Sequence, residues 1–122
     1  MTTVGVGIDL VDVERFDQII SRRPSLLTRL FTENELADCA GRTERLAARF
    51  AAKEAVLKAC GVGIGAARWR DIEILKTPSG APVVRVQRSA DELARRCGVE
   101  VWHLSLTHTD VSAGAVVVGS AS

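Results

Sequence analysis

The chain has 122 residues, 47% of them hydrophobic, with 16 lysines and arginines against 15 aspartates and glutamates. This length favours one domain, residues 1–122, with a real hydrophobic core. The balanced net charge shows none of the basic excess that is typical of nucleic-acid-binding proteins. The absence of a membrane-length apolar stretch or a signal-like N-terminus predicts a soluble, cytoplasmic protein.

The N-terminal segment TVGVGID, residues 3–9, is typical of a β-strand because small and β-branched residues alternate along it. Gly5 and Gly7 leave room for another backbone to approach closely. Asp12 is suited to cap a helix over residues 13–21, whose apolar side chains recur on one face.

Two further helices are expected in the first half of the chain. Thr32 precedes Glu35 by three residues, which is the capping-box spacing and predicts a helix through about Ala40. The longest helix is expected at about residues 43–60, where alanine and leucine are abundant. The glycine-rich loop 61–65 then ends it.

The second half of the chain is richer in strand signals. Strands are expected at residues 71–75, 83–86, 101–107 and 113–118, with a helix at residues 89–97. With the N-terminal strand this makes about five strands. The order of elements favours an α+β fold, in which an antiparallel sheet packs with the long helix.

Three cysteines, Cys39, Cys60 and Cys97, are odd in number and have no C-x-x-C spacing. This pattern argues against a disulfide framework or a zinc site. Reduced thiols are therefore expected.

Two carboxylates occupy positions where a plain core would have apolar residues. Asp9 ends an apolar strand, and Glu54 lies in a helix made mostly of alanine and aliphatic residues. If the fold brings them together, they form an oxygen site for a hard cation such as Mg²⁺. Two simpler interpretations remain open: Asp9 caps the next turn, or Glu54 forms a surface pair with Lys58 four residues on.

Two other features are compatible with phosphate binding. Lys58 is a point charge on a flexible stem, one turn after Glu54. His108 lies at a strand end between the hydroxyls of Thr107 and Thr109, which suit phosphate or ribose oxygens. A structural role for His108, and a simple helix stop for the glycine loop, remain the alternatives.

Four segments, in this order and over nearly the whole chain, resemble the holo-acyl-carrier-protein synthase family of 4′-phosphopantetheinyl transferases. They are GIDLVDVERF, ARFAAKEAVLKACGVGIG, RDIEI with the following PSGAP turn, and HLSLTHTDVSAGAVVV. The resemblance implies the 4′-phosphopantetheinyl transferase fold and a homotrimer with sites between subunits.

The resemblance also implies the chemistry of the site. Asp9 and Glu54 match the two Mg²⁺ ligands, and together with Lys58 they form the expected catalytic set. The residues expected to contact coenzyme A are Lys58, Gly65, Pro82, Thr107 and His108. Either Glu54 or a metal-bound water would accept the proton of the attacking hydroxyl.

The implied reaction transfers 4′-phosphopantetheine from coenzyme A to a serine of apo acyl carrier protein, in fatty acid biosynthesis. Arg15 and Arg22 match the basic face that docks the carrier protein. A noncatalytic coenzyme-A-binding module of the same fold, or a plain structural α+β domain, are the rival interpretations. The chain departs from the family's pattern in a short connection at residues 38–45 and in Gly114, where a somewhat larger residue is common.

Overall fold

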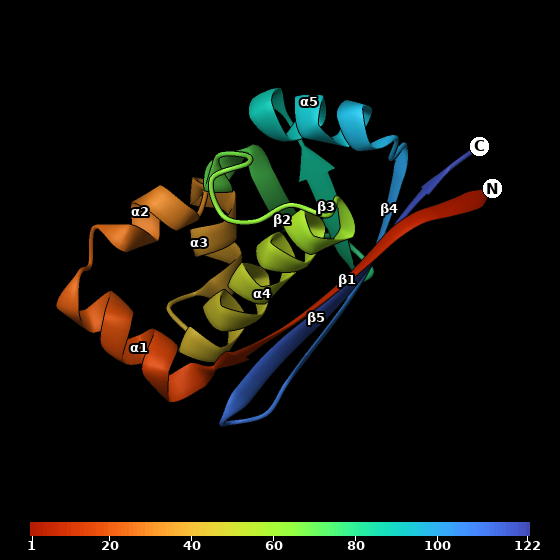
Figure 1. Cartoon of the computed structure of the whole chain (residues 1–122). Helices are drawn as coiled ribbons and strands as arrows, with labels where there is room; N and C mark the ends of the chain where they lie inside the picture. Colours follow the sequence, from red (N-terminus) through yellow and green to blue (C-terminus); the bar gives the residue numbers. More distant parts are fainter.

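The computed structural model describes all 122 residues, and its main layer is a three-stranded antiparallel sheet (Figure 1). The central strand β5 (Ser112–Ala121) pairs with β1 (Thr2–Asp12) on one side and with β4 (Val101–His108) on the other. The long helix α4 (Thr43–Ala59) packs across one face of this sheet. The other face of the sheet is not covered by any element (Figure 1).

The strands β2 (Ile72–Lys76) and β3 (Pro82–Val86) form a separate antiparallel hairpin. The expected α+β class, the five strands and their antiparallel pairing are confirmed. The strands are divided between two sheets, however, because β3 lies close to β4 without joining its hydrogen-bond ladder.

The other helices surround α4 on the side away from the sheet and beyond the hairpin (Figure 1). They are α1 (Val13–Arg22), α2 (Leu26–Leu30), α3 (Glu33–Cys39), α5 (Arg88–Cys97) and the short 3₁₀ turn η1 (Trp69–Asp71). None of the helices has the length and apolar character needed to cross a bilayer.

Both predicted helix caps are confirmed. The Asp12 carboxylate accepts a hydrogen bond from the backbone N–H of Arg15 at 2.9 Å, which starts α1. Thr32 and Glu35 form the reciprocal capping box at the start of α3. These caps satisfy backbone donors that the first turn of a helix otherwise leaves without partners.

The strand β1 lies unusually close to α4, because both surfaces lack bulky side chains where they meet. A Cβ atom on Gly5 would overlap the carbonyl oxygen of Ala59, and one on Gly7 would overlap that of Ala55. Ala55 and Ala59 are themselves buried. This contact sets the distance between β1 and the C-terminal half of α4, which carry Asp9 and Glu54.

A fully buried lysine fixes the other side of α4. The Lys53 ammonium donates to the carbonyl oxygens of Leu30 and Trp69 and to Glu35 Oε1, at 2.8–2.9 Å, so all three of its protons have acceptors. Glu35 Oε2 in turn accepts the backbone N–H of Ile74 in β2. Burial lowers the pKa of Lys53, although the carboxylate of Glu35 opposes the shift.

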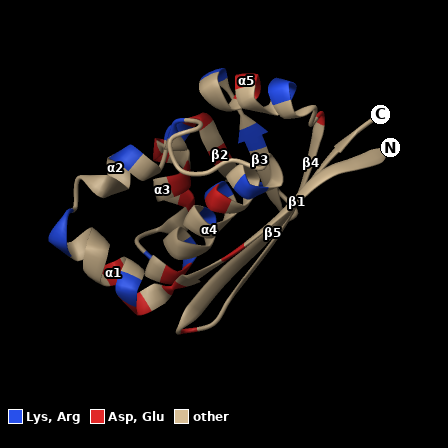
Figure 2. Ribbon diagram, viewed as in Figure 1, with Lys and Arg blue, Asp and Glu red and all other residues tan.

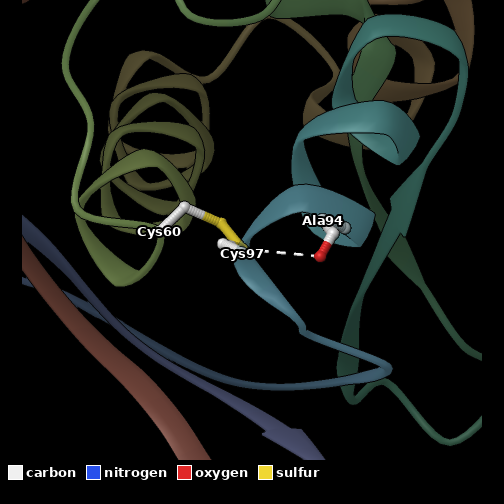
Figure 3. The surroundings of a disulfide bond; sticks show 3 residues. All are labelled: Cys60, Ala94 and Cys97. Atoms are coloured by element: carbon white, nitrogen blue, oxygen red, sulfur yellow. Dashed lines mark hydrogen bonds between the residues drawn. A yellow bond between two sulfur atoms is a disulfide. The ribbon is translucent and has the colours of Figure 1, made fainter.

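The expectation of three reduced cysteines is wrong for two of them. Cys60, at the end of α4, and Cys97, at the end of α5, form a disulfide with their Cα atoms 5.6 Å apart (Figure 3). Cys39 remains a buried free thiol. Sequence spacing did not reveal the pair because its members are 37 residues apart and meet only where two helices end side by side.

The β1–α4 contact predicts a large penalty for Gly7→Ala. The added methyl group would collide with helix backbone, which cannot rotate away, so the free energy of unfolding should fall by at least the ~1–3 kcal/mol typical of overpacking. Chemical denaturation of the two proteins measures the difference. Gly63→Ala is the matched control, because a Cβ there meets open space. Equal losses in the two variants would contradict the proposed role of the contact.

The disulfide predicts redox-dependent stability. Reduction should lower the free energy of unfolding by roughly 2–4 kcal/mol, since the unfolded chain regains the freedom of a closed loop. Thermal unfolding with and without dithiothreitol measures this change. Cys97→Ser, which lacks the bridge, should be insensitive to the reductant. A wild-type melting temperature that does not respond would show that the bridge adds no stability.

Candidate active site

The structure brings Asp9, Glu54 and Lys58 together at the edge of the sheet. Asp9 is on the face of β1 that turns toward α4 and is only 9% exposed. Lys58 donates to Asp9 Oδ1 at 2.9 Å and to the carbonyl oxygen of Ile8 at 3.0 Å. Lys58 of α4 therefore forms its ion pair with Asp9 of β1 and not with Glu54. The following helix is capped by Asp12 and not by Asp9.

The two carboxylates influence each other. Partial burial raises the pKa of Glu54, and the negative charge of Asp9 and a hydrogen bond to it raise this pKa further, while Lys58 lowers it. When both groups are charged, Asp9 Oδ2 is buried without a hydrogen-bond partner. A buried acceptor of this kind is costly unless a proton or a cation satisfies it.

These oxygens fit a hard divalent cation. Asp9 and Glu54 supply carboxylate ligands, and the partnerless Asp9 Oδ2 is an oxygen free to bind. No group of three or more His, Cys, Asp or Glu side chains comes together to hold a metal ion. Mg²⁺ is commonly held by one or two carboxylates together with substrate phosphates and water, so two protein ligands are a suitable number.

The carboxylates open onto a cleft of about 620 Å³. Asp9, Glu54 and Phe50 line it, together with Arg15 of α1 and Ile64 of the glycine loop. Gly65, which was expected to contact the nucleotide, does not line this cleft. The loop reaches the cleft only through Ile64.

A second cleft, of about 270 Å³, lies against the opposite side of α4, and its lining is basic apart from the carboxylate of Asp38. The expected residues Pro82 and His108 line it, together with Arg45, Arg49 and Lys76. Thr107 does not, because successive residues of a strand point to opposite faces. Thr107 lines a small hollow on the uncovered face of the sheet, beside Gly114.

The two clefts lie on different sides of α4 and do not join within one chain. Arg45 is about 180° and Arg49 about 140° around α4 from Glu54, at 3.6 residues per turn. The two sets of lining residues have no member in common. The helix therefore separates the carboxylates from the basic cleft within one chain.

Comparison with known proteins identifies the family. A family model for the 4′-phosphopantetheinyl transferase superfamily matches residues 5–116. The holo-acyl-carrier-protein synthase of Frankia alni is 47% identical over 118 residues, which are 97% of this chain and 98% of that protein. This chain belongs to the 4′-phosphopantetheinyl transferase superfamily.

Solved structures support the same assignment. The Helicobacter pylori holo-acyl-carrier-protein synthase, in complex with coenzyme A, matches with a TM-score of 0.86 at 32% identity, over 94% of this chain and 99% of that one. The Bacillus anthracis enzyme, in complex with coenzyme A (3′,5′-ADP), has a TM-score of 0.82 at 33% identity and full coverage of both chains.

Arg45, Arg49 and Lys76 were not predicted as site residues of this phosphopantetheinyl transferase. One signal was available: Arg45 and Arg49 are four residues apart on the predicted helix and so share a face. Arg49 is mostly buried, lies 3.9 Å from Asp38, and leaves its Nε without a partner. The helix face opposite Glu54 therefore carries a basic site, which the spacing of Arg45 and Arg49 alone could have indicated.

The predicted docking residues lie on α1, at the rim of the first cleft. Arg15 lines that cleft, while Arg22 is exposed in the last turn of α1 and lies outside it. Basic residues lie toward both ends of this helix (Figure 2). The same helix therefore connects the carboxylate site with an exposed basic surface.

Proposed function

We propose that this chain transfers 4′-phosphopantetheine from coenzyme A to a serine of apo acyl carrier protein. The products are the holo carrier protein and adenosine 3′,5′-bisphosphate. The observation that carries this proposal is that Asp9 and Glu54 line one cleft, with Lys58 paired to Asp9, in a member of the transferase superfamily. The curated relatives named as holo-acyl-carrier-protein synthases support the same activity. We propose that the carrier protein is the one used in fatty acid biosynthesis.

In the proposed reaction, the serine oxygen bonds to the phosphorus that carries the pantetheine arm. The bond from that phosphorus to the bridging oxygen breaks, and adenosine 3′,5′-bisphosphate leaves. Asp9 and Glu54 would hold Mg²⁺, which neutralises charge on the diphosphate and the leaving phosphate. Lys58 is placed to bind a phosphate oxygen where negative charge grows. The serine proton would pass either to Glu54 or to water at the site.

The basic cleft supplies a second anchor for the donor. Coenzyme A carries a 3′-phosphate at a distance from its diphosphate. Arg45, Arg49, Lys76 and His108 line the basic cleft, and its one carboxylate, Asp38, offsets only part of their positive charge. Arginine suits phosphate because its guanidinium donates two parallel hydrogen bonds. We assign this cleft to the 3′-phosphate end of coenzyme A.

One donor molecule would then need two copies of the chain, since α4 separates the two clefts. The uncovered sheet face favours such an assembly. Val4, Val6, Ile8 and Leu10 alternate along β1 on that face and are 40–75% exposed, and Val101 and Val116 extend the patch. The strands of this sheet carry few charges (Figure 2). Exposed apolar side chains gathered on one face in this way are typical of a protein interface, and we propose a homotrimer with its sites between subunits.

The carrier protein would approach along α1. Arg15 at the rim of the cleft and Arg22 two turns on present positive charge, and acyl carrier proteins are acidic helical domains. Complementary charge of this type raises the association rate and fixes orientation. The serine would then enter the cleft beside Arg15.

The proposed function predicts that Asp9→Asn and Glu54→Gln each reduce transfer at least ~10³-fold, because each removes a charged ligand from the transition state. Mass spectrometry of apo carrier protein, incubated with coenzyme A, Mg²⁺ and enzyme, detects the added arm. Circular dichroism checks that the variants are folded. Full transfer by both variants would reject the site, and no transfer by the wild-type protein would favour the noncatalytic module.

Arg15→Glu serves as the matched variant in this experiment, because it keeps both carboxylates and reverses one charge at the rim. It should retain the increase in melting temperature that coenzyme A and Mg²⁺ produce, while transfer to the carrier protein falls. Equal losses of donor binding and of transfer would place Arg15 in the donor site and not in docking.

The shared site predicts complementation between inactive subunits. Asp9→Asn and Arg45→Glu damage different clefts, so a mixed trimer contains some sites with two intact halves. Random mixing in equal amounts should restore about a quarter of wild-type activity, since each half is intact in half of the cases. Activity after co-expression of the two variants measures this. A mixture as inactive as its parents would show that each site belongs to one chain.

A further inference from the structure

The position of Lys58 is unusual for a residue whose only role is to bind phosphate. Its ammonium contacts Asp9 Oδ1 at 2.9 Å and the Ile8 carbonyl oxygen at 3.0 Å. Both acceptors belong to β1 and lie at the carboxylate site itself. The ammonium is thus bound to the same side chain that the proposed function assigns to the metal ion.

The charges of the side chains at this site do not balance. Asp9 and Glu54 bring two negative charges, and Lys58 is the one cation that forms an ion pair with either of them. Asp9 Oδ2 keeps no hydrogen-bond partner. The one ammonium therefore neutralises only part of the negative charge of the two carboxylates.

Lys58 is free to leave this position. Its side chain is 52% exposed, whereas that of Asp9 is 9% exposed. The ammonium of Lys58 is carried by four flexible methylene groups. Its three N–H donors can therefore exchange acceptors without backbone movement. Lys53, by contrast, is fully enclosed by three protein acceptors and has no such freedom.

We propose that Lys58 is a place-holder cation: it pairs with Asp9 until a divalent ion binds, and is then released toward the phosphates of the donor. This inference rests on the proposed function, because it assumes a metal at Asp9 and Glu54. It adds a role for Lys58 before the chemistry begins. The lysine competes with the metal for Asp9, and donor phosphates favour the metal-bound form by accepting the released ammonium.

The competition has a thermodynamic consequence. Metal and donor each favour the state in which Lys58 has left Asp9, so each should increase the affinity for the other through the lysine. The metal alone should bind weakly, since it must displace a charged hydrogen bond. The exchange therefore makes the metal site depend on the presence of the donor.

Direct binding of Mn²⁺ to the full-length protein, followed by electron paramagnetic resonance of the free ion, tests this inference. Without coenzyme A, Lys58→Met should bind Mn²⁺ about tenfold more tightly than wild type, because no ammonium has to be displaced. Addition of coenzyme A should tighten Mn²⁺ binding more in wild type than in Lys58→Met.

Arg15→Met is the matched control. Arg15 lines the same cleft but forms no ion pair with Asp9, so its loss removes one nearby positive charge without removing the competitor. Its Mn²⁺ affinity should change by less than about threefold, as expected for a screened charge. An equal increase in both variants, or none in Lys58→Met, would overturn the exchange while leaving the metal site intact. Failure of wild type and Lys58→Met to bind Mn²⁺ with or without coenzyme A would overturn the metal site itself.

A second measurement uses only the wild-type protein. Brief acetylation followed by peptide mass spectrometry should modify Lys58 slowly in metal-free protein and faster after Mg²⁺ is added at a concentration that saturates the site without donor. Lys76 is an internal reference, since it is exposed and lies in the other cleft. A Lys58 to Lys76 modification ratio that Mg²⁺ leaves unchanged would contradict the release of Lys58.

Discussion

The close contact between β1 and α4 is the constraint on which the rest of this structure depends. Gly5 and Gly7 place strand backbone against helix backbone, and Ala55 and Ala59 leave the helix surface flat enough to receive it. Any larger residue at the two glycines would push the strand away. The contact is therefore what allows a strand carboxylate, Asp9, to reach a helix carboxylate and lysine in the next layer.

The site that results has more negative than positive charge. Two carboxylates face each other, one of their oxygens is buried without a partner, and a single mobile lysine supplies the compensating charge. The surrounding structure tolerates this because α4 is fixed from the other side. Lys53 and Glu35 connect it to α3 and β2 through hydrogen bonds that are fully satisfied. The network of Lys53 and Glu35, in which every hydrogen bond is made, thus supports the site of Asp9, Glu54 and Lys58, in which one oxygen has no partner.

The sequence predicted what depends on local pattern and on motif order. The caps at Asp12 and Thr32 follow from short-range spacing, and Asp9 and Glu54 were noticed because a charge is out of place in an apolar segment. Their meeting was expected only from the family resemblance, since no local rule brings residue 9 to residue 54. The division of the strands into two sheets and the pairing of Cys60 with Cys97 depend on long-range packing. The opposite orientation of Thr107 and His108 was predictable from strand alternation but requires knowing which face each cleft is on.

The most direct test of the central claim is a crystal structure of this protein with Mn²⁺ and coenzyme A, analysed by anomalous scattering. The account predicts a single strong peak bridging the diphosphate and the carboxylates of Asp9 and Glu54, within about 2.0–2.4 Å of an oxygen from each. It also predicts that the adenosine end of the donor lies in the basic cleft of a neighbouring subunit. A metal ion bound by phosphates alone, with the two carboxylates turned away from it, would contradict the account.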